Sequence, residues 1–226
     1  MSSSPSVYFF SFLLAFCSLF YELVYAEILS VCIGGTKIQY ITTISLFTCA
    51  LGLGSITFKK FSAPETLRRN FFTVELLLML LGGVGPFFIT WMLQPGGIPG
   101  LETVKILACY SLIFCIGFLS GFELPFLFSL KEKAEGKILA MDYLGMLAAS
   151  LSFPLLFRPS LGAAASTLLI ALANGAALIW LRPGENKSKS VTIVLSVILM
   201  TFMILLLNQR ETLNQFLSVL YLGGRS

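Results

Sequence analysis

The sequence predicts an all-α integral membrane protein, a bundle of about seven transmembrane helices. Of its 226 residues, 57% are hydrophobic and only 12% are charged. A soluble domain contains about 25% charged residues, so this composition cannot cover a water-facing surface. Apolar runs that reach the roughly 20 residues needed to cross a bilayer recur along the whole chain. We therefore expect one transmembrane helical domain over residues 1–226.

Charged residues, proline and glycine divide the apolar sequence into segments of spanning length. The predicted spans are residues 7–33, 38–58, 71–93, 106–130, 138–157, 160–181 and 191–208. The remaining residues, 209–226, are expected to form a polar and amphipathic tail.

The first span follows Met1–Ser6, which contains no basic residue. This start lacks the positive charge of a cleavable signal peptide, and the apolar run exceeds the roughly 7–15 residues of a signal-peptide core. We expect the segment to remain in the protein as a membrane helix.

Each later span is set off by a short connection that is polar, charged or rich in glycine and proline. In chain order, these connections are Gly34–Lys37, Lys59–Asn70, Gln94–Gly100, Lys131–Lys137, Arg158–Pro159 and Arg182–Ser190. None of them is long enough to form a second domain.

The distribution of Lys and Arg predicts the orientation, because cytoplasmic connections carry an excess of both residues. With a cytoplasmic N-terminus, the inside connections hold ten of them: Lys59, Lys60, Arg68, Arg69, Lys131, Lys133, Lys137, Arg182, Lys187 and Lys189. The outside segments then hold five: Lys37, Lys105, Arg158, Arg210 and Arg225. We therefore expect the N-terminus inside and the C-terminus outside. This bias accounts for the net charge of +4, and we expect no nucleic-acid partner.

The composition also excludes several kinds of catalysis. The chain contains no histidine, which removes histidine-based acid–base chemistry and the usual zinc motifs. Asp142 is the only aspartate, so the chain cannot be a two-aspartate intramembrane protease. The five cysteines lie in apolar runs without a CxxC pair, a pattern typical of buried small hydrophobes. We expect no cofactor, no metal site and no enzymatic activity.

Acidic residues lie inside the predicted spans, whereas all fifteen Lys and Arg lie outside them. The acids within spans are Glu22, Glu27, Glu75, Glu123 and Asp142. An acid at membrane depth is costly and by default marks a functional site that faces the bundle interior. Without a basic partner at that depth, each acid must be protonated, hydrogen-bonded or directed at an external cation. The pattern therefore predicts a site for protons or cationic ligands.

Helical spacing assigns neighbours to these acids. Glu22 shares a face with small and polar residues suited to close helix contact, namely Ala15, Ser18, Tyr25 and Ala26. Glu27 lies about 140° around the same helix and cannot share that face. Asp142 lies at the end of a similar seam formed by Gly145, Ala149 and Ser152.

The fourth span carries a third candidate feature around Glu123. Gly117 and Gly121 form a GxxxG contact face, and Pro125 leaves the carbonyl group of Gly121 without its helical donor. A free carbonyl beside a carboxylate could coordinate a cation. Pro86 and Pro154 predict two further interruptions, and broken helices are common around transporter sites.

Structural alternatives exist for each of these features. Asp142 and Glu75 lie close to predicted helix ends, where they would serve as caps or interface residues. Glu27 has either a functional or an interface role, because its face is mostly large and apolar. Glycine-rich stretches also serve plain helix packing.

Several segments together carry a family resemblance. They are Tyr21–Leu29, Gly34–Gly35, Gly52–Ser55, Ser120–Pro125, Met141–Gly145, Phe153–Leu156, Leu161–Gly162 and Asn174. In order and spacing they resemble the membrane domain that precedes the aminopropyltransferase in fused bacterial spermidine synthases. The resemblance implies a bacterial inner-membrane location and a link to polyamines. One departure is Glu27, where relatives are expected to have Gln or Arg.

The segment Asn208–Gly224 resembles the junction at which such fusions enter their soluble synthase. The sequence stops at Ser226 without that catalytic domain. Spermidine synthesis is therefore not carried over from the resemblance.

Two functions from different classes follow from these observations. The first is a non-enzymatic membrane module that binds or transports a small cation, with a polyamine favoured. Its ligand-binding residues would be Glu22, Tyr25, Glu27, Gly121, Glu123, Pro125, Asp142 and Tyr143. The second is an accessory or anchoring subunit whose acids hold helices together or bind a partner protein. A lipid-handling enzyme is a third alternative, which lacks a visible nucleophile and base.

Overall fold

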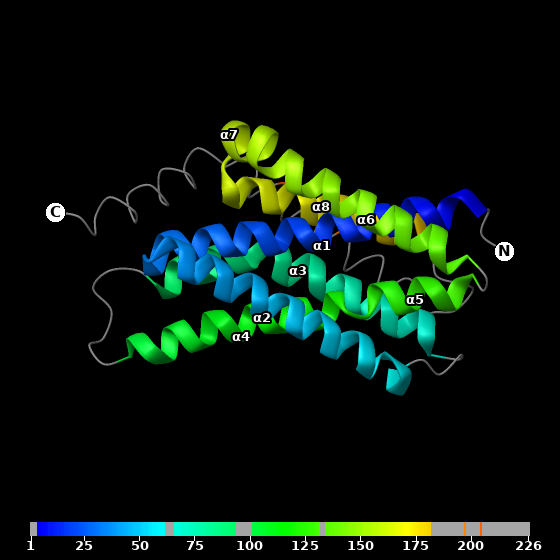
Figure 1. Cartoon of the computed structure of the whole chain (residues 1–226), viewed down its shortest axis with the longest axis horizontal. Helices are drawn as coiled ribbons and strands as arrows, with labels where there is room; N and C mark the ends of the chain where they lie inside the picture. Colours follow the sequence, from blue (N-terminus) through cyan, green and yellow to red (C-terminus); the bar gives the residue numbers. More distant parts are fainter. Residues whose placement is uncertain are drawn as a thin grey trace.

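The computed structural model describes residues 4–61, 66–93, 101–131 and 134–181, together with Val197 and Ile204. Throughout this described part the regular structure is helical, without a strand, which confirms the predicted all-α class. The α-helices are α1 (Ser4–Ile33), α2 (Thr36–Thr57), α3 (Leu67–Met92), α4 (Glu102–Ser120), α5 (Glu123–Leu130), α6 (Glu135–Ser152), α7 (Arg158–Leu161) and α8 (Ala163–Leu181). A 3-10 turn, η1 (Phe58–Phe61), follows α2, and a π-helical turn, η2 (Phe153–Phe157), joins α6 to α7. The long helices run roughly along the longest axis of the molecule (Figure 1).

Five helical stretches of the described chain are long and apolar enough to cross a membrane. They are Val7–Ile33, Lys37–Lys60, Arg69–Met92, Glu102–Leu130 and Glu135–Leu161, and α8 contributes a shorter apolar helix over Ala163–Ala176. The described residues thus contain six apolar helical segments where the sequence predicts seven spans. The seventh predicted span, 191–208, and the tail, 209–226, lie outside them, except that Val197 and Ile204 are helical.

Arg158 and Pro159, predicted as a connection, are instead the first residues of α7. Proline is tolerated at the start of a helix because its missing N–H has no helical acceptor there. The chain turns at Gly162, whose φ of 79° is readily adopted only by glycine. As a result, α8 begins at Ala163 and not at residue 160.

The prolines interrupt the helices differently from the prediction. Helix α3 continues through Pro86, and the Thr90 hydroxyl donates a hydrogen bond of 2.7 Å to the Pro86 carbonyl. The predicted interruption at Pro86 is therefore wrong. Pro154 lies in the π-helical turn η2. The fourth predicted span breaks at Gly121–Phe122, which places Pro125 in the first turn of α5.

Helix α1 is the centre of the bundle and contacts α2, α3, α4, α5, α6 and α8. Two glycine seams bring neighbouring helices close together. A Cβ atom on Gly145 of α6 would lie 2.2 Å from the Phe12 carbonyl oxygen of α1, and one on Gly121 would lie 2.2 Å from the Leu51 carbonyl oxygen of α2. The packing seam predicted for α6 and the GxxxG contact face predicted around Gly121 are both confirmed.

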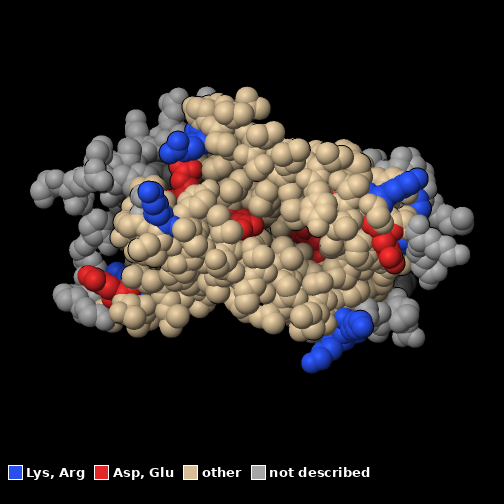
Figure 2. Space-filling view, in the orientation of Figure 1, with Lys and Arg blue, Asp and Glu red and all other residues tan. Residues whose placement is uncertain are grey.

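The surface separates charge from apolar side chains. On the face shown in Figure 2, Lys and Arg gather toward the two ends of the molecule, and the middle band is almost uncharged apart from acidic atoms seen in recesses. Large apolar side chains are exposed along α2 and along α6 with η2, among them Ile38, Ile41, Ile56, Leu147 and Leu155. Exposed apolar area of this kind is typical of surfaces that face lipid or a partner.

Candidate functional site

Four acids lie buried within the bundle, each on a different helix. The exposed fractions are 8% for Glu22 on α1, 1% for Glu75 on α3, 7% for Glu123 on α5 and 8% for Asp142 on α6. The prediction that Glu22 and Glu123 face the interior is therefore confirmed. A buried carboxyl group is costly unless it is neutralised or paired, so these four positions need a physical explanation.

Two of the buried acids act on a third. Glu75 and Asp142 are the charged groups that act electrostatically on Glu123. The Tyr21 side chain is within reach of both Glu75 and Glu123, and Asn174 of α8 lies beside the Glu75 carboxyl group. We call Tyr21, Glu75, Glu123, Asp142 and Asn174 the central polar cluster.

Several polar atoms in and next to this cluster are buried without a hydrogen-bond partner. They are the Tyr21 Oη, both carboxyl oxygens of Glu75, the Asn174 Oδ1 and the Ser120 Oγ. Ser120 ends α4, just before the break that leads to Glu123. Native proteins leave few buried polar atoms unpaired, and each such atom calls for an explanation such as local strain, a bound water or ion, or a functional role.

Close helix contacts hold the members of the cluster in place. The Tyr21 ring reaches α3 over Gly82, where a Cβ atom would come within 2.5 Å of the ring. The break after Ser120 makes Glu123 the first residue of α5, so its carboxyl group is carried by a separate short helix. The Gly145 seam draws α6 against α1 and brings Asp142 into the bundle.

Neither Glu75 nor Asp142 is a helix cap, which was one structural alternative for both. Helix α3 begins at Leu67 and α6 begins at Glu135, so each acid lies about two turns inside its helix. Glu75 is too deeply buried for its carboxyl group to reach the solvent. The sequence placed both acids too near a helix end because the predicted spans begin several residues too late.

Glu22 and Glu27 lie apart from the central polar cluster. Both act electrostatically on Tyr40 of α2. Glu27 also pairs with Arg158, with the Glu27 Oε1 at 2.5 Å from the Arg158 Nε. The expectation that no basic residue pairs with the acids is therefore wrong at Glu27.

The Glu27–Arg158 pair borders a pocket of about 330 Å³. Leu23 and Glu27 of α1, Tyr40 of α2 and residues of α6, η2 and α7 line it. The π-helical turn η2 contributes to this lining, and π-helical turns are frequent at functional sites in proteins.

The other predicted ligand-binding residues have distinct positions. Tyr25 is buried, and its hydroxyl donates a hydrogen bond of 2.5 Å to the Leu81 carbonyl of α3. Tyr143 has 61% of its side chain exposed and lies away from the cluster. Gly121 serves the contact between α4 and α2, and Pro125 is half-buried in the first turn of α5.

Sequence reasoning left three polar residues of this region without a functional role: Tyr21, Ser120 and Asn174. Each stands in an apolar run, where one polar group is easily taken for packing. The signal that could have found them is their position in the segments that carry the family resemblance.

Among the residues that the structure describes, no three His, Cys, Asp or Glu side chains converge closely enough to hold a metal ion. The acids of the central polar cluster thus influence one another without sharing one coordination point.

Comparison with known proteins identifies relatives of the chain. Polyamine aminopropyltransferase 2 of Ralstonia nicotianae is 32% identical over 177 residues, which are 75% of this chain and 33% of that protein. The polyamine aminopropyltransferase of Leptospira interrogans is 28% identical over 209 residues, 88% of this chain and 40% of that protein. This chain is therefore similar to one part of each of these polyamine aminopropyltransferases. It spans between a third and two fifths of the length of these two relatives.

The resemblance drawn from the sequence segments is thereby confirmed. A further polyamine aminopropyltransferase, from Oceanobacillus iheyensis, is 29% identical over 178 residues, 76% of this chain and 34% of that protein. No protein-family model matches the chain. No solved structure matches it either.

Proposed function

We propose that this chain is a membrane-embedded module that binds a small organic cation, with a polyamine as the favoured ligand, at the central polar cluster. The observation that carries the proposal is the buried position of Glu123, on which two further buried acids, Glu75 and Asp142, act electrostatically. A bound polycation would supply a positive charge, which none of the described groups that act on Glu123 carries.

The chemistry of a polyamine matches this arrangement. Its ammonium groups are separated by short carbon chains, so they can meet carboxyl groups that do not converge on one point. Ammonium groups donate hydrogen bonds, and the Asn174 Oδ1 beside the Glu75 carboxyl group is a buried acceptor without a hydrogen-bond partner. The relatives are named for polyamines, which favours this ligand over other organic cations.

Membrane embedding is supported by three features. Five described helices have spanning length and composition, apolar side chains are exposed along α2 and α6, and charge lies mainly at the ends of the visible face (Figure 2). The end of the bundle that holds the start of α1 also holds the η1 turn and the ends of α5 and α6 that carry Lys131 and Lys137 (Figure 1). We place this basic end in the cytoplasm of a bacterium, and the membrane is then its inner membrane.

An accessory or anchoring role is the competing function, and one observation favours it. The two pockets described here are not lined by Glu75, Glu123 or Asp142. If no path opens to these acids, they would act as neutral hydrogen-bonding groups that hold helices or a partner protein.

Calorimetric titration of the purified protein with spermidine at two pH values separates the two functions. A buried carboxyl group without a positive partner favours its neutral form, so a cation must displace protons in order to bind. The affinity for spermidine should therefore rise with pH. The variant Glu123→Gln should bind at least about tenfold more weakly, because a charge-assisted hydrogen bond is lost.

Glu102→Gln is the matched control, since Glu102 is an exposed acid in the first turn of α4. It should bind spermidine like the unmodified protein. Thermal unfolding of both variants reports whether the fold is intact. Absence of spermidine binding by the unmodified protein at both pH values would rule out the proposal in favour of the accessory role.

A further inference from the structure

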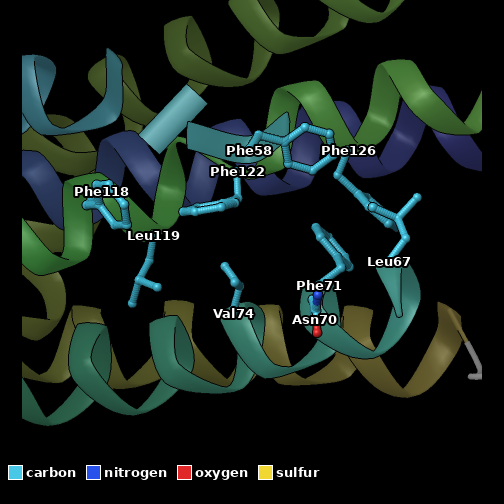
Figure 3. A pocket seen from close by; sticks show the side chains of 9 residues that line it. All are labelled: Phe58, Leu67, Asn70, Phe71, Val74, Phe118, Leu119, Phe122 and Phe126. Atoms are coloured by element: carbon cyan, nitrogen blue, oxygen red, sulfur yellow. The ribbon is translucent and has the colours of Figure 1, made fainter. Parts of the chain in front are cut away.

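An apolar pocket of about 180 Å³ lies between the beginning of α3 and the break that separates α4 from α5. Five phenylalanine rings line it, and Figure 3 shows Phe118, Phe122 and Phe126 on one side with Phe71 on the other. The rings of Phe71 and Phe126 stack, with their centroids 3.7 Å apart and an angle of 7° between the ring planes. The walls of the pocket are therefore flat, rigid and almost wholly apolar.

The size and chemistry of the pocket limit what can occupy it. Pockets that take a whole small molecule usually measure about 300–1,000 Å³ and contain several polar groups. This one is smaller, and Asn70 is the polar residue in its lining. The Asn70 amide already donates a hydrogen bond to the Thr66 hydroxyl at 3.4 Å. The pocket thus suits a slim hydrocarbon segment.

Basic residues directly adjoin the pocket lining. Lys59 and Lys60 follow Phe58, the η1 residue that lines the pocket, and Arg69 precedes Asn70 on α3. All three basic side chains are exposed. Basic side chains next to a membrane attract anionic lipid headgroups, so the charge beside this pocket complements a phosphate.

We infer that this pocket binds one acyl chain of an anionic phospholipid, whose phosphate is held by Lys59, Lys60 and Arg69. The inference rests on the membrane embedding in the proposed function, but it does not depend on polyamine binding. The two parts of the lipid bind to different residues. The phenylalanine rings bury methylene groups of the acyl chain, and the basic residues bind the negative headgroup.

Native mass spectrometry of the detergent-purified protein tests this inference with two lipids of identical acyl chains, phosphatidylglycerol and phosphatidylcholine. Phosphatidylglycerol should bind with an affinity about tenfold higher. The double variant Lys60→Gln/Arg69→Gln should lose this preference while still binding both lipids. The matched control Lys37→Gln/Lys105→Gln removes two charges at the opposite end of the bundle and should keep the preference.

A second variant, Val74→Trp, tests the chain-binding part, because Val74 lines the pocket. Because the larger side chain fills the pocket, the affinity for both lipids should fall by about tenfold. This is the loss expected when two methylene groups can no longer be buried there. Equal binding of the two lipids by the unmodified protein would overturn the inference, as would undiminished phosphatidylglycerol binding by a folded Val74→Trp protein. Spermidine titration of the same preparations reports separately on the proposed function, so failure of one does not imply failure of the other.

Discussion

The ring of Tyr21 lies directly over Gly82, so close that a Cβ atom there would come within 2.5 Å of the Tyr21 Cζ. This contact lets a large polar side chain of α1 cross to α3 while its hydroxyl stays buried and unpaired. The position of Tyr21 in the central polar cluster therefore depends on the absence of a side chain on a neighbouring helix.

Gly82→Ala should destabilise the protein by about 1–3 kcal/mol, because the added methyl group overpacks the Tyr21 ring. Thermal unfolding in detergent measures the loss. The matched control is Gly136→Ala in the first turn of α6, where a Cβ atom would meet nothing within 4 Å. An unchanged melting temperature for Gly82→Ala would show that the ring moves aside at little cost.

Gly121→Ala should destabilise the protein more than Gly82→Ala. Here the added methyl group would meet backbone, with the Leu51 carbonyl oxygen at 2.2 Å and the Gly54 Cα at 2.9 Å. Backbone yields less readily than a side chain, so α2 and α4 would have to separate. Gly52→Ala on α2, where the Cβ atom has open space, is the control and should be neutral or slightly stabilising. If Gly121→Ala were as stable as Gly52→Ala, the close packing of α2 against α4 would be contradicted.

The Glu27–Arg158 ion pair should contribute only about 0.2–1 kcal/mol to stability, as exposed pairs do. The side chain of Arg158 is 59% exposed and that of Glu27 is 19% exposed. A double-mutant cycle with Glu27→Gln and Arg158→Gln measures the coupling. A coupling of several kcal/mol would mean that water does not reach this end of the bundle.

The proposed orientation can be checked by labelling single cysteines introduced into a background from which the five native cysteines are removed. A membrane-impermeant maleimide should label Lys37→Cys in intact cells, because Lys37 lies in the first turn of α2, at the proposed outer end of the bundle. It should label Lys137→Cys only after lysis. Labelling of both positions in intact cells would refute the orientation, and the reverse pattern would invert it.

The sequence predicted individual helices better than the relations between them. The first span was correct to within a few residues because α1 contains no proline beyond its first turn, no glycine and no basic residue between Val7 and Ile33. The start of α8 was misplaced because proline at the first turn of α7 looks like a connection in sequence, although it is compatible with a helix. Local composition therefore predicts that a span exists more reliably than it predicts the residues at which the span begins and ends.

The central polar cluster was only partly predictable for a different reason. Its members come from α1, α3, α5, α6 and α8, and helical periodicity relates residues only within one helix. The partner of Glu27 was missed because Arg158 is far away in sequence and had been assigned to a connection. Tyr21 was missed because a tyrosine in an apolar run looks like a packing residue until its hydroxyl is shown to be unpaired.

The short helix α5 carries residues of both proposed sites on one element. Its first residue, Glu123, belongs to the central polar cluster, and one turn later Phe126 forms a wall of the phenylalanine pocket. Only Gly121 and Phe122 join this helix to α4. A tilt of α5 would move both groups at once, so a lipid tail that favours one tilt would alter the affinity of Glu123 for a cation. By thermodynamic reciprocity, the cation would alter lipid affinity by the same factor.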